Sequence, residues 1–399
     1  MTTINLEHKT LFVTGAAGFI GSNLVKRLLK DTQTATIVGI DNMNDYYDVS
    51  LKEYRLQQLS DLSLQTSDIA WSFIRGSIAD RPLIDALFAE HHFDIVVNLA
   101  AQAGVRYSID NPDAYIQSNI IGFYNILEAC RHSKELVAEN SKTQNSTHSS
   151  TLNNESALNS KLSARACSLD PSRTLHYDGV RHLVYASSSS VYGGNKKVPF
   201  STDDRVDNPV SLYAATKKSN ELFAHCYSKL YDIPSTGLRF FTVYGPAGRP
   251  DMAYFGFTNK LVKGDTIQIY NYGHCRRDFT YVDDIVEGIV RVMQKAPARK
   301  TGDDGLPIPP YAVYNIGGGQ PENLLDFVTI LQEELVRAKV LPSDFNFEEH
   351  KQLVAMQPGD VPVTYADSSA LEKDFGFVPR ITLREGLRKF ATWYKEYYG

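Results

Sequence analysis

The stretch Leu11-Phe12-Val13-Thr14-Gly15-Ala16-Ala17-Gly18-Phe19-Ile20-Gly21 decides the fold of this chain. An apolar run ends in a turn whose glycines are spaced three residues apart, and a helical pattern follows to about Lys30. A strand that passes through such a turn into a helix directs backbone N–H groups and a helix N-terminus toward a bound phosphate. We therefore expect a dinucleotide-binding unit at the start of the chain.

Short β-branched runs alternate with helical patterns through residues 1–244, which predicts an α/β fold with a Rossmann-type, doubly wound parallel sheet. Beyond Tyr244 glycine and proline become frequent. We expect residues 245–399 to form mainly a smaller α/β substrate-binding lobe over the carboxyl edge of the sheet, with some segments returning to the first domain. The expected strands are 10–14, 35–40, 71–75, 94–99, 180–187, 235–241, 267–270 and 312–316, and the expected helices are 18–30, 80–90, 113–132, 212–231, 284–294 and 323–338.

Residues 133–177 interrupt this alternation, because they are rich in Ser, Asn and Thr and show no clean period. A connection at this place in the fold has roughly 2–6 residues. We therefore interpret 133–177 as a surface insertion within the first domain, disordered or loosely helical.

Composition excludes several classes of protein. The net charge of −5 and the absence of a basic patch argue against a nucleic-acid partner. No apolar run approaches the roughly 20 residues of a membrane helix, and the polar N-terminus has no signal-peptide core. The four cysteines are scattered without a zinc-ligand spacing, so we expect no metal and a reducing, cytoplasmic location.

Asp41 ends the second expected strand, about 20 residues beyond the glycine turn, at the usual position for ribose recognition. A carboxylate there accepts hydrogen bonds from both ribose hydroxyls and repels a 2′-phosphate. Since no arginine follows directly, NAD is favoured over NADP.

Tyr213 and Lys217 lie one helical turn apart and therefore on the same helix face. Tyrosine has a pKa of about 10, too high for a base at neutral pH. We expect the Lys217 ammonium, with the positive nicotinamide of NAD, to lower that pKa. The hydroxyls of residues 187–190 follow the fifth strand and could share the proton with Tyr213. Beside a dinucleotide, this set indicates hydride transfer to or from an alcohol.

Longer segments carry a resemblance to a known family. They are DNMNDYYD (41–48), NLAAQAGVRYS (98–108), ASSSSVYG (186–193), RFFTVYGP (239–246), GRPDM (248–252) and RRDFTYVDD (276–284). On these motifs the chain resembles the extended short-chain dehydrogenase/reductases, within them the nucleotide-sugar epimerases, and most closely the UDP-glucuronate 4-epimerases. The resemblance covers the whole chain apart from 133–177.

The resemblance implies a role for each matching residue. Ser188 is the catalytic hydroxyl, Tyr213 the base and Lys217 its electrostatic partner. The implied substrate-binding residues are Arg106, Ser188, Ser189, Ser190, Thr242, Arg249 and Arg277, with Ser189, Ser190 and Thr242 on a uronate carboxylate and Arg249 and Arg277 on the UDP phosphates. The implied NAD-binding residues are Gly15, Gly18, Phe19, Ile20, Gly21, Asp41, Asn42, Ser77, Ile78, Leu99, Ala100, Ala101, Tyr213 and Lys217. Ser77 stands where many relatives carry an Asp.

The implied reaction is the reversible 4-epimerisation of UDP-glucuronate to UDP-galacturonate through a 4-keto intermediate, with tightly bound NAD. Ser189 and Ser190 occupy the places of the Asp-Glu pair that a 4,6-dehydratase needs. The alternatives are a UDP-glucuronate decarboxylase, an epimerase of a neutral UDP-hexose and a non-catalytic NAD-binding scaffold. The resemblance also implies a homodimer that pairs the helices at 113–132 and 212–231.

Overall fold

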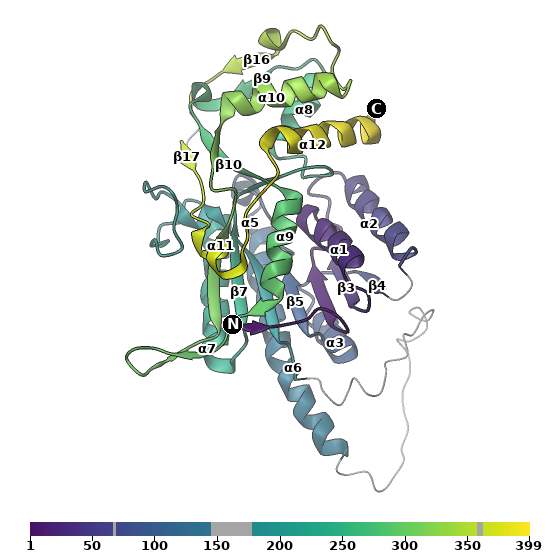
Figure 1. Ribbon diagram of the computed structural model, residues 1–399, viewed down its shortest axis with the longest axis vertical. Coiled ribbons are helices and arrows are strands. Elements are labelled where there is room, and N and C mark those ends of the chain that lie inside the picture. The colour runs from purple at the N-terminus through teal and green to yellow at the C-terminus, as the bar shows by residue number, and fades with distance from the viewer. Residues whose placement is uncertain (67–68, 145–177, 357–361) are drawn as a thin grey trace.

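A seven-stranded parallel sheet forms the centre of the molecule (Figure 1). The structure is a computed structural model, and it describes residues 1–66, 69–144, 178–356 and 362–399. Its strand order is β14-β7-β6-β5-β2-β3-β4. The strands are β2 (Thr10–Thr14), β3 (Thr36–Asp41), β4 (Ala70–Arg75), β5 (Ile95–Asn98), β6 (His182–Ser188), β7 (Ser235–Phe240) and β14 (Tyr311–Ile316). The order reverses between β2 and β5, which confirms the expected doubly wound, Rossmann-type fold.

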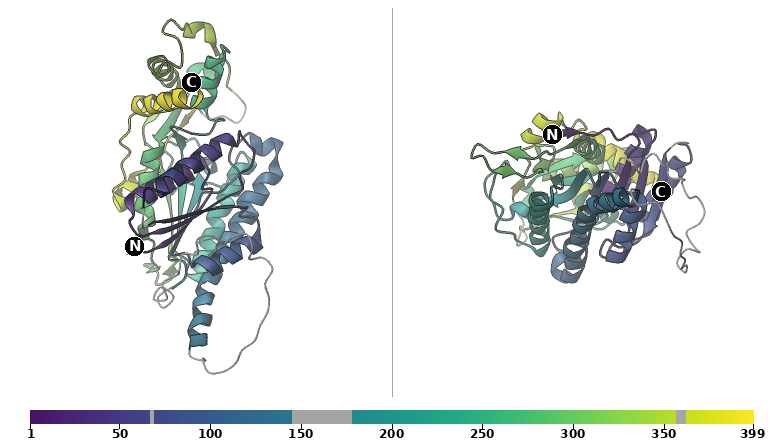
Figure 2. Two further views of the ribbon diagram at one scale, coloured as in Figure 1. Left: turned by 90° about the vertical axis from the view of Figure 1, so that its right-hand side faces the viewer. Right: turned by 90° about the horizontal axis from the view of Figure 1, so that it is seen from below.

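Helices cover both faces of the sheet, as Figures 1 and 2 show. Helices α1 and α9 pack side by side on one face, and α3, α6 and α7 lie on the other. Within β2, Leu11 and Val13 pack in one hydrophobic cluster and Phe12 in the other, so the strand is buried on both sides. These helices span α1 (Phe19–Asp31), α3 (Arg81–His91), α6 (Gly122–Gln144), α7 (Leu212–Tyr231) and α9 (Val282–Met293).

The helix expected at 113–132 is divided and longer than predicted. It begins as the short helix α5 (Pro112–Tyr115), passes through a π-helical turn, Ile116–Ile121, and continues as α6 to Gln144. Helix α6 therefore includes the first residues of the expected insertion, because 133–144 contain no Gly or Pro and several good helix formers. The rest of the expected insertion, 145–177, lies outside the described residues.

A second group of elements follows the carboxyl end of β7, at the top of Figure 1. Strand β8 (Thr242–Tyr244) follows β7 almost directly and pairs in parallel with β10 (Arg276–Tyr281). Stacking of Phe279 on Phe327, with ring centroids 4.4 Å apart, packs β10 against α10. The other elements here are α8 (Ala253–Val262), β9 (Ile267–Ile269), β15 (Pro321–Asn323), α10 (Leu324–Arg337), β16 (Lys351–Leu353), β17 (Val363–Thr364) and α12 (Leu383–Tyr398).

Several segments differ from the expected pattern. Strand β14, expected among the strands of the smaller lobe, pairs with β7 at the edge of the large sheet. The sequence pattern did not predict α2 (Ser50–Ser63), α8, α11 (Ser369–Phe375) or α12. The remaining short elements of the described residues are β1 (Thr2–Thr3), α4 (Tyr107–Asp110), β11 (Lys295–Ala296), a hairpin of β12 (Lys300–Thr301) and β13 (Pro307–Ile308), and the short 3-10 helices Ser189–Tyr192, Tyr270–Gly273 and Phe347–His350. Among the helices of the described residues, none has the length and apolarity to cross a membrane.

Candidate active site

The glycine turn between β2 and α1 needs glycine for steric reasons. Gly15 has φ +70°, and a Cβ on it would lie 2.8 Å from the backbone nitrogen of Ala100. A Cβ on Gly21 would lie 2.1 Å from the carbonyl oxygen of Gly15. Gly18 is the N-cap of α1 and no side chain caps the helix, so the first-turn N–H groups, at Phe19 and Ile20, are left to bind an anion. This turn fits the diphosphate of a dinucleotide.

Asp41 lies at the carboxyl end of β3, beside the glycine turn. Its carboxylate accepts a hydrogen bond of 2.9 Å from the Met43 N–H, and the Lys52 ammonium lies 3.5 Å away. Lys52 also donates to the side-chain oxygen of Asn44 at 2.8 Å. The sequence did not predict a role for Lys52. Helix α2 was not predicted, and nothing else in the sequence pattern indicates that Lys52 lies beside Asp41. Asn42 is exposed, and its side-chain oxygen accepts from the Asn44 N–H.

The other residues predicted to bind NAD follow the carboxyl ends of β4 and β5. The Ser77 hydroxyl accepts a hydrogen bond of 3.1 Å from the Ala79 N–H, and the Ile78 carbonyl accepts one of 3.0 Å from the Asn125 amide. The Ala100 N–H donates to the Thr14 hydroxyl at 3.0 Å, which holds the segment Leu99–Ala101 against β2. Because parallel strands end at one edge, these residues face the same side of the sheet as the glycine turn.

Helix α7 and strand β6 bring the three predicted catalytic residues together. Ser211 caps α7 by accepting a hydrogen bond from the Ala214 N–H, which places Tyr213 and Lys217 in its first two turns. The Lys217 ammonium is buried and donates to the Ala186 carbonyl at 2.8 Å. The Ser188 hydroxyl, at the end of β6, hydrogen-bonds to Tyr213 and accepts from the Ser190 hydroxyl at 2.9 Å.

The expectation that Lys217 lowers the pKa of Tyr213 is wrong for the chain by itself. Burial raises the pKa of Tyr213, and the opposing effects come from the Ser188 hydrogen bond and the charge of Arg249. Burial also lowers the pKa of Lys217 to about 7, because no carboxylate compensates its charge. Lys217 is therefore partly neutral near pH 7 and a weaker electrostatic partner than the sequence suggested.

Asn119, in the π-helical turn, is a further residue of the site that the sequence analysis missed. Its side-chain oxygen accepts from the Gln102 N–H at 2.8 Å, and its side-chain nitrogen donates to the Thr216 hydroxyl at 3.0 Å. Its carbonyl accepts from Asn220 at 2.6 Å. Asn119 thus links the loop after β5 to α7 by hydrogen bonds. The π-helical turn that positions Asn119 for these bonds has no characteristic sequence pattern.

The predicted uronate-binding hydroxyls lie at the ends of neighbouring strands. Ser188 pairs with Phe240 in the β6–β7 ladder, so Ser189 and Ser190 come next to the start of β8, where Thr242 lies. Thr242 in turn pairs with Phe279 of β10. Three hydroxyl-bearing residues thus follow the carboxyl edge beside the catalytic group.

The three predicted arginines contact protein groups of different kinds. Arg249 donates to both carboxylate oxygens of Asp251, at 3.0 and 2.5 Å. Arg277 donates to the carbonyls of Arg276 and Pro362, each at 3.0 Å. Arg106 lies over the Tyr270 ring, 5.8 Å from its centroid.

Tyr46 lies between Asp251, the partner of Arg249, and the backbone at Gly104, which precedes Arg106. No role for Tyr46 was predicted from the sequence. Its hydroxyl donates to Asp251 at 3.1 Å, and burial together with the Asp251 charge raises the pKa of Tyr46 to about 12. A Cβ on Gly104, which has φ +107°, would lie 2.9 Å from this hydroxyl. The Arg249 charge lowers the pKa of Tyr213, so Arg249 lies close to the predicted base.

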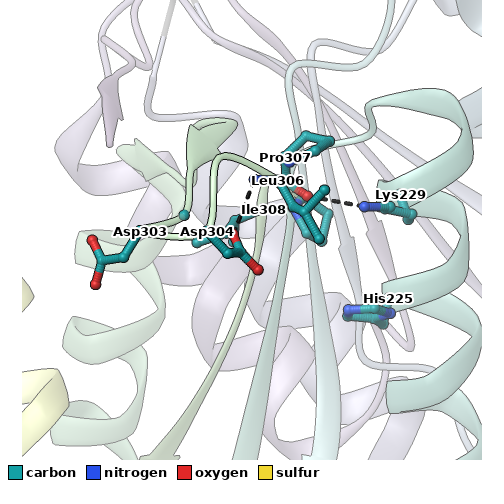
Figure 3. Close-up of a pocket in the computed structure, with 9 residues that line it drawn as sticks. His225, Lys229, Asp303, Asp304, Leu306, Pro307 and Ile308 are labelled. Carbon is teal, nitrogen blue, oxygen red and sulfur yellow. Dashed lines mark hydrogen bonds between the residues drawn. The ribbon is translucent and has the colours of Figure 1, made fainter.

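A surface hollow on the outer side of α7 is separate from this site. His225 and Lys229 line it from α7, opposite the turn of the β12–β13 hairpin (Figure 3). Lys229 donates to the Pro307 carbonyl at 2.9 Å and so holds the hairpin in place. Among the residues that the structure describes, no group of three or more His, Cys, Asp or Glu could hold a metal ion.

A Rossmann-type sheet with a phosphate-binding glycine turn and a Ser-Tyr-Lys group defines a nucleotide-dependent oxidoreductase-like enzyme. Residues 11–317 match the NAD dependent epimerase/dehydratase family, and the chain belongs to this family.

Two curated relatives and one solved structure are similar over nearly the whole chain. Protein CapI of Staphylococcus aureus is 44% identical, over 97% of this chain and 99% of that protein. UDP-glucuronate 4-epimerase 4 of Arabidopsis thaliana is 41% identical, over 98% of this chain and 76% of that protein. The crystal structure of UDP-glucuronic acid 4-epimerase from Bacillus cereus, in complex with UDP-glucuronic acid and NAD, has a TM-score of 0.73 at 29% identity and covers 98% of this chain and 100% of that one.

Proposed function

We propose that this protein is a UDP-glucuronate 4-epimerase, which interconverts UDP-glucuronate and UDP-galacturonate with NAD as a retained cofactor. The observation that carries the proposal is the group of Ser188, Tyr213 and Lys217 at the edge where the dinucleotide turn also ends. The hydroxyls of Ser189, Ser190 and Thr242 beside this group support a carboxylate-bearing sugar. Relatives whose names specify this reaction, at 38 to 41% identity, support the same substrate.

Each residue of the proposed site has a separate role in the reaction. Tyr213 takes the proton from the 4-hydroxyl of the sugar, and Ser188, hydrogen-bonded to Tyr213, orients that hydroxyl. NAD held by the glycine turn and Asp41 would supply the hydride acceptor, and then the hydride donor, for carbon 4 of the sugar. Arg249 and Arg277 bind the diphosphate as fixed positive charges, while the sugar turns between the two half-reactions. Tyr213 then returns the proton, so the products balance the substrates.

We also propose that the protein is a homodimer that pairs α6 and α7 with the same helices of a second copy, and that it acts in the cytoplasm. Leu222 and Leu230 on α7 and Tyr124 on α6 are exposed apolar side chains, which supports burial of this surface in a dimer.

The experiment that tests the activity is incubation of the purified protein with UDP-glucuronate, without added NAD, followed by proton NMR of the UDP-sugars. A mixture of UDP-glucuronate and UDP-galacturonate is expected. Formation of carbon dioxide and a UDP-pentose instead would identify a decarboxylase.

If no product forms, the incubation is repeated with added NAD, because Ser77 replaces the acidic residue that many relatives use. Turnover of only neutral UDP-hexoses would contradict the uronate specificity. Inactivity on every UDP-sugar would contradict an enzymatic function and favour an NAD-binding scaffold.

A further inference from the structure

A buried ion pair lies one turn of α7 beyond Lys217, next to the proposed catalytic residues. Glu221 of α7 and Arg239 of β7 are 2% and 3% exposed. Arg239 donates to both carboxylate oxygens of Glu221, each at 2.8 Å, which is the two-point geometry that guanidinium and carboxylate prefer. The mechanism proposed above uses neither residue.

Glu221 continues the row of catalytic residues along α7. Tyr213, Lys217 and Glu221 are spaced four residues apart, so they lie on one face of the helix, the face toward β6. Lys217 contacts β6 through the Ala186 carbonyl, and Glu221 contacts it through the Ser187 hydroxyl, which donates at 2.6 Å. The next residue of β6 is Ser188. Two successive contacts thus set the helix against the strand that carries the catalytic hydroxyl.

The same carboxylate also fixes the neighbouring strands. Ser187 and Arg239 are direct partners in the β6–β7 ladder. Glu221 contacts both side chains and so links the two strands to α7. Arg239 donates further to the Tyr192 hydroxyl at 3.0 Å, and that hydroxyl donates to Asn315 of β14 at 2.7 Å. The arrangement therefore holds three strands and α7 in one position.

Both charges of the pair persist despite their burial. Arg239 and Ser187 hold the pKa of Glu221 below its usual value, and Glu221 raises the pKa of Arg239. A buried pair is costly to desolvate and is often replaceable by apolar residues without loss of stability. A role in geometry is thus a better explanation for it than a role in stability.

We propose that Glu221, acting through Ser187 and Arg239, is a positioning residue that sets the spacing between Tyr213 on α7 and Ser188 on β6. The proposal rests on the epimerase function proposed above. Displacement of a reacting group by about 1 Å costs on the order of 100-fold in rate. Loss of the bridge should therefore lower kcat, while KM, which depends on diphosphate contacts elsewhere, stays nearly constant.

Two variants test the proposal by steady-state kinetics on the UDP-sugar that the wild-type protein turns over. Ser187→Ala removes one hydroxyl and leaves the ion pair intact, so the fold should persist. Glu221→Gln/Arg239→Met removes both charges together and leaves no unpaired buried ion. We expect kcat to fall roughly tenfold in the first and roughly 100-fold in the second, with KM within about threefold of wild type.

Lys218→Gln is the matched control, because Lys218 lies 3.5 Å from the same carboxylate but at the surface of α7. Its kcat should equal that of the wild type. A wild-type kcat in the Ser187 or the double variant, or an equal change of KM and kcat, would overturn the positioning role. Failure of the wild type to act on UDP-glucuronate counts against the proposed substrate instead, and a wild type that turns over no UDP-sugar contradicts both proposals.

Discussion

Lys217, which we predict to be catalytic, lies in an environment that disfavours its positive charge. The residue is 3% exposed, and its ammonium donates to the Ala186 carbonyl. Burial lowers its pKa to about 7, whereas the unfolded chain keeps the ordinary value near 10.5. Between these two pH values the unfolded state binds more protons than the folded state, so the stability contribution of this group rises with pH.

The change Lys217→Met removes this dependence. The contribution of Lys217 is complete above about pH 10.5 and is lost as the pH falls to about 7. Lys217→Met should therefore melt at a higher temperature than wild type at pH 7, by an amount that shrinks toward pH 10. Its kcat should also fall, since Met cannot donate to the Ala186 carbonyl, through which Lys217 holds α7 against β6. Thermal melts across this pH range check the prediction, and a constant difference in Tm would contradict it.

Thr242 is expected to protect the 4-keto intermediate from losing carbon dioxide. A 4-keto uronate is a β-keto acid, and it decarboxylates fastest when the breaking bond is perpendicular to the carbonyl plane. We expect the hydroxyls of Ser189, Ser190 and Thr242 to hold the carboxylate away from that alignment. A hydrogen bond to a charged group is worth about 1.5 kcal/mol or more, so Thr242→Ala should raise the share of UDP-pentose roughly tenfold.

Thr242→Ser serves as the control for this prediction, because it retains the hydroxyl and loses only a methyl group. The products of both variants are quantified by proton NMR. An unchanged product ratio in Thr242→Ala would contradict the protective role of Thr242.

At the scale of elements, the glycine turn and α1 were predictable from the sequence, because their glycine spacing is local. The positive φ of Gly15 and the 2.1 Å approach of a Gly21 Cβ to the Gly15 carbonyl oxygen arise within the turn, whereas the approach of Gly15 to Ala100 depends on the loop after β5. The segments after β5 were less predictable. The division of the helix at 113–132 depends on Asn119, which bonds to the distant residues Gln102 and Thr216.

Gly21→Ala tests the role of close packing in cofactor binding. The new Cβ would lie 2.1 Å from the Gly15 carbonyl oxygen, so the turn and the N-terminus of α1 must separate. We expect the purified variant to retain at most about a tenth of the wild-type NAD. If the displaced turn weakens NAD binding by about 1.4 kcal/mol, the affinity for NAD falls tenfold. The bound cofactor is measured after denaturation of the protein.

Gly256→Ala is the matched control for this substitution. Gly256 lies in α8, and the nearest atom to a new Cβ is the Pro250 carbonyl oxygen at 3.7 Å. This change should leave bound NAD unchanged and stabilise the protein by up to about 1 kcal/mol, because alanine favours a helix. Equal NAD content in the Gly21 and Gly256 variants would contradict the packing argument.

At the scale of the whole molecule, α7 carries exposed apolar side chains that the proposed dimer would bury. Leu222 is 58% exposed there. Leu222→Glu should convert the proposed dimer into a monomer, because a carboxylate buried in an apolar interface is strongly unfavourable. Light scattering after gel filtration measures the mass directly.

Leu64→Glu is the control for the dimer, because Leu64 is 80% exposed at the end of α2, away from α6 and α7. It should retain the mass of the wild type. A wild-type mass near the 44.6 kDa of one chain would contradict the proposed dimer.

The sequence by itself determined the doubly wound sheet, the glycine turn, Asp41 and the spacing of Tyr213 and Lys217. These features depend on residues that are close in the chain, so their periodicity and spacing are visible without a structure. Only the tertiary structure decided that Lys52 returns to Asp41 and that β14 completes the large sheet. It also decided the pKa directions of Tyr213 and Lys217 and the contact of Glu221 with two strands, because burial and contacts between distant segments exist only in the folded chain.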